Sequence, residues 1–329
     1  MKRQSIKKQG IIAAMTALLM LLVTGCSSAS SDQEATAATD DKTSQTRQEG
    51  VEELLENGLN EISYTTPGGE TGYLYITESI LRHPEEKVPM VLMMMSTGGE
   101  ARDNARTCGW VEKAQQESMI VLAPVYNNYV TYSELAGIVS AVDYVTENYP
   151  VDVERIYAAG FSNGGAVSVA LASEYPQKFA AISAYGWMVD MRNRDENYDM
   201  PFQVIQGTEE STYRTDSGAM AVMEDEQKAI RSLFLFNEMI EDSLQPDYTA
   251  APYWGYAPDD SHMIRPDGRE WRVNNFYKEQ YDAPFAQLVM IDGAGHEPNT
   301  SEADVSWDFF KNFSRPADGT VKELTEPQP

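Results

Sequence analysis

The sequence predicts an α/β fold with a mostly parallel, doubly wound sheet. Short apolar runs that suit buried strands alternate along the chain with longer segments that suit packed helices. At one junction an apolar run at residues 155–159 leads into a Gly-Phe-Ser-Asn-Gly motif at residues 160–164, and a second apolar segment follows at residues 166–172. A strand, a sharp turn and a helix in succession indicate a reactive side chain at the edge of a parallel sheet.

The other elements are expected in the following order. Strands at residues 61–64 and 72–76 form an opening hairpin around the turn Pro67-Gly68-Gly69. Before the motif we expect strands at residues 90–95 and from residue 119, and helices at residues 102–117 and 133–148. After it we expect strands at residues 182–185, 202–206 and 285–291, and helices at residues 220–240 and 301–313.

The connection between the strands at residues 202–206 and 285–291 is much longer than a usual link in a compact domain. Residues 211–283 are therefore expected to be an insertion near the functional site. Two interpretations of seven of its aromatic residues stay open: a stacking wall for a sugar or phenolic ring, or packing of the insertion onto the domain. These residues are Tyr248, Tyr253, Trp254, Tyr256, Trp271, Phe276 and Tyr277.

Residues 1–25 predict a secretory signal. Basic residues are followed by an apolar stretch at residues 11–23 and by small residues before Cys26. The stretch is shorter than the roughly 20 residues that span a bilayer. Residues 23–26, Val-Thr-Gly-Cys, resemble a bacterial lipobox, in which the cysteine becomes the lipidated first residue. The resemblance implies an extracytoplasmic protein held at the cell membrane through its lipid anchor alone.

The rest of the chain divides into three segments. Residues 26–50 are small and polar, as in a flexible tether, residues 51–315 form the domain, and residues 316–329 form a polar tail. The formal charge of −26 argues against nucleic acid and anionic membrane surfaces as partners. The three histidines and two cysteines are scattered without metal-ligand spacing, so no metal or other cofactor is expected.

Ser162 is the candidate nucleophile. A serine at the apex of this turn has a strained backbone conformation. The residues two positions before and two positions after it must have almost no side chain, so that the strand and the helix can approach each other, and Gly160 and Gly164 satisfy this requirement. A serine hydroxyl is a poor nucleophile at neutral pH, so it requires a histidine to accept its proton and an acid to orient that histidine. In this architecture the three residues follow in the order serine, acid, histidine.

His296 is the candidate base. His83 precedes the serine in a polar loop, and His262 lies in a turn-rich stretch that no apolar strand precedes. His296 follows the apolar run at residues 285–291 and a flexible Gly-Ala-Gly segment, which suits a loop that aims a side chain.

The candidate acids follow the strand at residues 202–206, because the orienting carboxylate of this architecture usually lies in the loop after that strand. Glu210 is the first choice, and Glu209 and Asp216 stay open as alternatives.

Several segments resemble the secreted polyhydroxybutyrate depolymerase and feruloyl/acetyl esterase group of α/β-hydrolases. These segments are residues 151–186 around the motif, residues 89–124 and residues 293–296. The similarity extends over about residues 62–313, but residues 211–282 match the group poorly. The resemblance implies an α/β-hydrolase fold in which Ser162 is the nucleophile and His296 the base. It makes Glu210 the acid, where the group usually has Asp.

This fold also implies an oxyanion hole made of two backbone N–H groups. One belongs to Asn163, directly after the nucleophile. The other comes from the loop after the strand at residues 90–95, where Ser96-Thr97-Gly98-Gly99 stands in place of the group's usual His-Gly. Gly98 is the first choice and Thr97 the second, unless the two glycines only make a turn.

Together these residues favour a serine esterase that acts through an acyl-enzyme. The expected partner is a small-molecule or oligosaccharide ester: acetyl or feruloyl esters of carbohydrate, or polyester. Two alternatives stay open, a serine peptidase of the same fold and a surface binding lipoprotein without chemistry.

Overall fold

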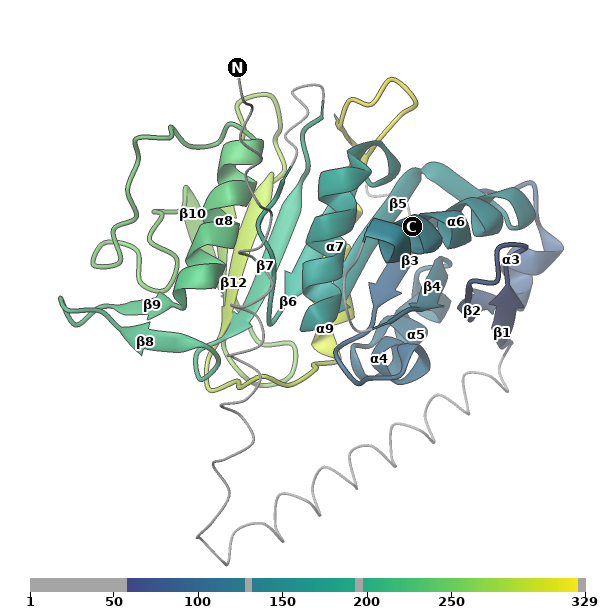
Figure 1. The fold of residues 1–329 in the computed structure, drawn as a ribbon, viewed down its shortest axis with the longest axis horizontal. Coiled ribbons are helices and arrows are strands. Elements are labelled where there is room, and N and C mark those ends of the chain that lie inside the picture. Colours follow the sequence, from purple (N-terminus) through teal and green to yellow (C-terminus); the bar gives the residue numbers. More distant parts are fainter. Residues whose placement is uncertain (1–57, 128–131, 193–197, 325–329) are drawn as a thin grey trace, which may run out of the picture. The chain divides into compact units, whose positions relative to one another are not determined.

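The computed structural model describes residues 58–127, 132–192 and 198–324 (Figure 1). The expected signal, the tether and the lipidation site at Cys26 lie outside these residues. Within the described part of the chain, no helix combines the length and the apolar character that crossing a bilayer requires.

One large sheet forms the centre of the domain, with the strand order β1-β2-β4-β3-β5-β6-β7-β12-β11-β10. Neighbours from β4 to β12 pair in parallel, whereas β1, β2, β11 and β10 are antiparallel to their neighbours. The strands are β1 (Leu59–Thr65), β2 (Thr71–Thr77), β3 (Val88–Met94), β4 (Ile120–Val125), β5 (Val151–Phe161), β6 (Ala181–Tyr185), β7 (Phe202–Gly207), β10 (Asp260–Ile264), β11 (Trp271–Phe276) and β12 (Ala286–Ile291). The carboxyl ends of the parallel strands therefore share one edge.

Helices cover both faces of this sheet. On one face α6, α7 and α8 share a buried apolar cluster with the strands, and on the other α4, α5 and α9 share a second cluster (Figure 1). The helices are α3 (Glu78–Arg82), α4 (Ala101–Thr107), α5 (Trp110–Gln116), α6 (Tyr132–Asn148), α7 (Asn163–Glu174), a 3₁₀ turn (Pro176–Lys178), α8 (Glu224–Phe236) and α9 (Ser301–Phe310).

The methionine-rich strand β3 shows how the sequence builds these layers. Met90, Leu92 and Met94 belong to one apolar cluster and Val91 and Met93 to the other, because alternate side chains of a strand point to opposite faces. All five are fully buried, as expected for a strand covered on both sides.

The single helix expected at residues 102–117 is two helices, α4 and α5. Gly109 interrupts it with φ +82°, and a Cβ there would lie 2.0 Å from the carbonyl oxygen of Thr300. At this break the carbonyl oxygen of Cys108 accepts the N–H of Ala303 in α9 at 3.2 Å, a tertiary contact that local sequence does not reveal.

The insertion at residues 211–283 has two parts. Its first part forms the hairpin β8 (Thr212–Arg214) and β9 (Met220–Val222) followed by α8, so the helix expected at residues 220–240 starts later and is shorter. Its last part adds β11 and β10 to the central sheet beyond β12. Of the seven aromatic residues considered for a stacking wall, four are buried, which favours packing over that role: Trp254, Tyr256, Trp271 and Phe276.

The segment expected to be a polar tail from residue 316 folds back onto the domain as far as residue 324. Strands β13 (Phe313–Ser314) and β14 (Lys322–Glu323) pair, and Val321 is buried. The buried Arg315 donates to the carbonyl oxygens of Phe179, Asp199 and Gly319. One arginine thus ties this segment to the domain, which the polar composition of the segment concealed.

Candidate active site

Ser162 lies at the sharp turn between β5 and α7, at the carboxyl edge of the parallel strands. Its backbone has φ 57° and ψ −122°, a conformation that residues other than glycine rarely adopt. Its N–H donates to the carbonyl oxygen of Tyr185 on the neighbouring strand at 2.7 Å. The turn is therefore held by the sheet itself.

The two glycines that flank Ser162 are required by close backbone approach. A Cβ on Gly160 would lie 2.3 Å from the carbonyl carbon of Gly164, and a Cβ on Gly164 would lie 2.1 Å from the carbonyl oxygen of Met94. Such distances leave no room for any side chain, because strand, turn and helix meet here.

His296 joins Ser162 to Glu210. Its Nε2 lies 2.8 Å from Oγ of Ser162, and its Nδ1 pairs with Oε1 of Glu210. Glu210, in the loop after β7, is 2% exposed, whereas the imidazole in the loop after β12 is about half exposed. This is the hydrogen-bonded array of nucleophile, base and orienting acid. Of the three proposed acids, the structure brings Glu210 to the histidine, while Glu209 and Asp216 are exposed.

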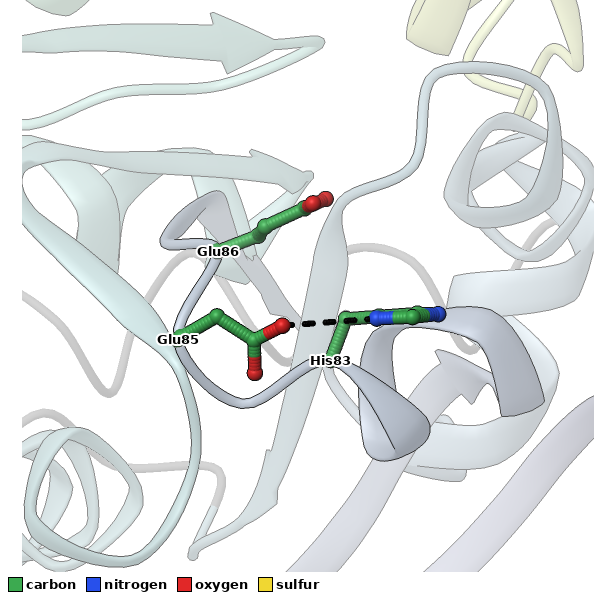
Figure 2. A group of neighbouring side chains, drawn as sticks. All are labelled: His83, Glu85 and Glu86. Carbon is green, nitrogen blue, oxygen red and sulfur yellow. Dashed lines mark hydrogen bonds and ion pairs between the residues drawn. The ribbon is translucent and has the colours of Figure 1, made fainter.

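The other two histidines lie elsewhere. His262 is exposed on β10, where it pairs with Val273. His83, after α3, faces Glu85 at 3.4 Å (Figure 2). Among the residues that the structure describes, His83, Glu85 and Glu86 are the group of His, Asp or Glu side chains close enough to hold a metal ion. All three are exposed, and His83 pairs with Glu85.

Parts of this chain are similar to known proteins. The prolyl oligopeptidase family model matches residues 126–232, which include Ser162 and Glu210. Feruloyl esterase B of Talaromyces funiculosus is 28% identical over 136 residues, 37% of this chain and 37% of that protein. Poly(3-hydroxybutyrate) depolymerase of Ralstonia pickettii is 31% identical over 138 residues, 35% of this chain and 28% of that protein. The matches thus span about a third of these relatives.

Among solved structures, an acetyl xylan esterase from Aspergillus awamori is similar with a TM-score of 0.53 and 14% identity, over 77% of this chain and 99% of that chain. This chain has the α/β-hydrolase fold. The predicted fold is therefore confirmed, as is the predicted resemblance to feruloyl esterases and polyhydroxybutyrate depolymerases.

Hydrogen bonds join the loop that carries Glu210 to the loop that carries His296. The N–H of Glu209 donates to the carbonyl oxygen of Ala294 at 2.9 Å, and the N–H of Gly293 donates to Oγ1 of Thr208 at 2.8 Å. These bonds fix Glu210 and His296 relative to one another, although the two residues are far apart in sequence.

Aromatic side chains support the imidazole. The ring of Phe161 lies 4.8 Å from that of His296, centroid to centroid, and the hydroxyl of Tyr185 donates to the carbonyl oxygen of Glu297 at 2.7 Å. Sequence reasoning missed both contacts. Their only signal in the sequence is position, since Phe161 precedes the nucleophile and Tyr185 ends the next strand.

The electrostatics of the site favour a protonated histidine. The hydrogen bond to Glu210 raises the pKa of His296 above its ordinary value, against the opposing effect of burial. The negative charges of Glu210 and Glu226 act in the same direction as the hydrogen bond. The site is therefore suited to stabilise the imidazolium that forms when a serine loses its proton.

The candidate oxyanion residues lie on both sides of the turn. Asn163 is the first residue of α7, and Gly98 lies in the loop after β3, the strand that pairs with β5 up to Met94 and Gly160. Gly98 has φ +70°, and the N–H of Gly99 donates to the carbonyl oxygen of Ser96 at 3.1 Å. A tight turn is therefore present at Gly98 and Gly99, and their role as donors stays a prediction.

Proposed function

We propose that this α/β-hydrolase is a serine hydrolase that cleaves carboxylic esters. The observation that carries the proposal is the unbroken contact from Ser162 through His296 to the buried carboxylate of Glu210. A hydroxyl paired with an imidazole, itself oriented by a carboxylate, is an arrangement built for acyl transfer. The names of the relatives, two esterases and a depolymerase, support esters as the substrates.

In the proposed reaction, Oγ of Ser162 attacks the carbonyl carbon of the ester while Nε2 of His296 accepts its proton. The N–H groups of Asn163 and Gly98 bind the oxyanion. His296 then protonates the leaving alcohol, and the acyl group stays on Ser162. Water, deprotonated by the same imidazole, attacks the acyl carbon, and His296 returns the proton to Oγ of Ser162 as the acid is released. Glu210 keeps Nδ1 protonated and stabilises the imidazolium throughout.

The proposed substrates are acetyl or feruloyl esters of carbohydrate, or a polyester, because the similar proteins carry these substrates in their names. A second candidate is a peptidase of the same fold, which the match to the prolyl oligopeptidase family favours. The proposed location is extracytoplasmic, at the cell membrane, through a lipid on Cys26.

One panel of substrates tests the proposal on the wild-type protein and on Ser162→Ala. It contains an acetylated xylo-oligosaccharide, methyl ferulate, a hydroxybutyrate oligomer and an aminoacyl anilide. We expect one of the esters to be cleaved fastest, and Ser162→Ala to lose several powers of ten in kcat. Fastest cleavage of the anilide would replace the esterase by the peptidase. If a fluorophosphonate does not label Ser162, both enzyme hypotheses are wrong and the binding lipoprotein without chemistry remains.

A further inference from the structure

Glu226 is an acidic residue in an unusual place. It lies in the first turn of α8 and is 3% exposed, whereas its neighbours Glu224 and Asp225 have side chains that are 80% and 81% exposed. Acidic side chains are almost never buried unless they are paired, since burial strongly disfavours the charge. No cation is paired with it among the residues that the structure describes, and the proposed reaction above makes no use of it.

The hydrogen bonds of Glu226 lead to the catalytic acid. One carboxyl oxygen accepts the N–H of Met223 at 3.2 Å, which is an ordinary helix cap. The other accepts Nε2 of Gln206 at 3.0 Å, and the same nitrogen lies 3.4 Å from the backbone oxygen of Glu210. Gln206 is fully buried at the end of β7. One amide therefore bridges Glu226 to the residue that orients His296.

Charge links Glu226 to the same site. The pKa of Glu226 is raised to about 7: burial and the charge of Glu210 raise it, while the hydrogen bonds from Gln206 and from the N–H of Met223 and the charge of His296 lower it. The interaction is reciprocal, since the charge of Glu226 raises the pKa of His296. The groups that act on Glu226 thus come from α8, from β7 and its loop, and from the loop after β12. Glu224 and Asp225, on its own helix, face solvent beside Lys228.

We propose that Glu226 is a positioning residue of the catalytic site: through Gln206 it holds the backbone of Glu210, and its charge stabilises protonated His296. This inference deepens the proposed function and rests on it. The cap of α8 alone does not explain a buried carboxyl, because a capping glutamate satisfies the same N–H from the protein surface. A second carboxylate near the imidazole makes the charge on His296 easier to form when Ser162 reacts.

The decisive comparison is Glu226→Gln against Glu224→Gln, in the full chain. Both remove one negative charge from the first turn of α8, but only the first removes a buried charge that acts on His296. We expect Glu226→Gln to lower the pH at which the His296 ring titrates by NMR, and to reduce kcat/KM at pH 8, because the imidazolium that forms in the reaction loses a stabilising charge. Glu224→Gln should match the wild type in both measurements. Glu226→Asp, which restores the charge, should move the NMR midpoint back toward the wild-type value.

The wild-type protein gives a second test that needs no variant. Because Glu226 and His296 interact, the His296 resonance should follow two coupled ionisations rather than one. A single-step titration, or an unchanged midpoint in folded Glu226→Gln, would overturn the inference. The NMR measurement does not depend on turnover, so it separates this inference from the proposed function. If His296 titrates as expected but the protein cleaves no ester, the proposed function is wrong and the inference about Glu226 stands.

Discussion

Ser162 occupies a backbone conformation that costs a non-glycine residue about 1–3 kcal/mol. The cost is independent of the hydroxyl group, so Ser162→Ala keeps the strain while Ser162→Gly removes it. We expect Ser162→Gly to unfold at a higher temperature than Ser162→Ala, by a difference of about 1 kcal/mol in free energy of unfolding. Thermal melts of the two inactive variants measure this. Equal melting temperatures would show that the turn is unstrained.

Glu210 and His296 give a prediction on pH. The base must be neutral to accept a proton, so kcat/KM should fall as pH drops through a pKa that Glu210 holds above the ordinary 6.5. Glu210→Gln should move this fall to lower pH and reduce kcat on the order of 10⁴-fold. The controls Glu209→Gln and Asp216→Asn should behave as wild type. A comparable loss of kcat in either control variant would show that the substituted residue, rather than Glu210, is the catalytic acid.

Gly186, directly after β6, leaves room for the side chains of Glu210 and His296. It has φ +77°, and a Cβ there would lie 3.0 Å from Oε1 of Glu210 and 3.3 Å from Cε1 of His296. Gly186→Ala should therefore displace the acid and lower kcat at least tenfold. Gly69→Ala is the matched control, since Gly69 has φ +96° in the β1–β2 hairpin and no neighbour within 4 Å of its Cβ position. Both variants lose stability, but only Gly186→Ala should lose activity in the folded protein.

At the scale of single residues, the sequence predicted Ser162 and His296 through local rules. Glycine spacing identified the turn, and the scarcity of histidines reduced the base to three positions. Glu226 escaped because it stands beside Glu224 and Asp225, and nothing local distinguishes a buried acid from two exposed ones. Only the packing of α8 against the end of β7 makes the difference.

At the scale of elements, α9 contains the fully buried Glu302. Burial raises its pKa to about 8 from an ordinary 4.5, although Cys108 and Trp110 act in the opposite direction. Between these values the folded protein holds a proton that the unfolded chain lacks, so stability falls as pH rises through this window. Glu302→Gln should lack this fall.

The measurement is denaturant unfolding of wild type and Glu302→Gln at pH 5 and pH 8.5. We expect the variant to gain stability relative to the wild type at the higher pH, with the control Asp308→Asn, exposed on the same helix, showing no such gain. A parallel pH dependence in wild type and Glu302→Gln would show that Glu302 is not the titrating group.

The elements that sequence mispredicted share one cause. The break at Gly109, the late start of α8 and the folded segment after residue 315 each depend on a contact with a distant part of the chain. Apolar periodicity predicted the buried strands well, because a strand covered on both faces must be apolar throughout. Apolar periodicity carries no information on which polar segments pack against distant parts of the chain.

At the scale of the whole molecule, the length of the insertion was predictable but its architecture was not. The residues that were expected to form an insertion near the site also lengthen the sheet through β11 and β10. The edge of a sheet accepts a further strand through backbone hydrogen bonds that every sequence offers. A pattern of side chains therefore does not distinguish a cap over a pocket from an extension of the sheet.

The net charge of −26 bears on how this protein would be held at a membrane. An acidic protein is repelled by anionic lipid surfaces, so attachment requires a covalent lipid rather than electrostatics, and stable anchoring requires two hydrophobic signals. We expect the wild-type protein to stay with the membrane fraction through a high-salt wash. Cys26→Ser should be released or remain unprocessed, while Cys108→Ser, which alters the other cysteine, should stay attached. Mass spectrometry of the amino terminus decides the matter: a mature wild-type chain that begins at an unmodified residue other than Cys26 would exclude the anchor.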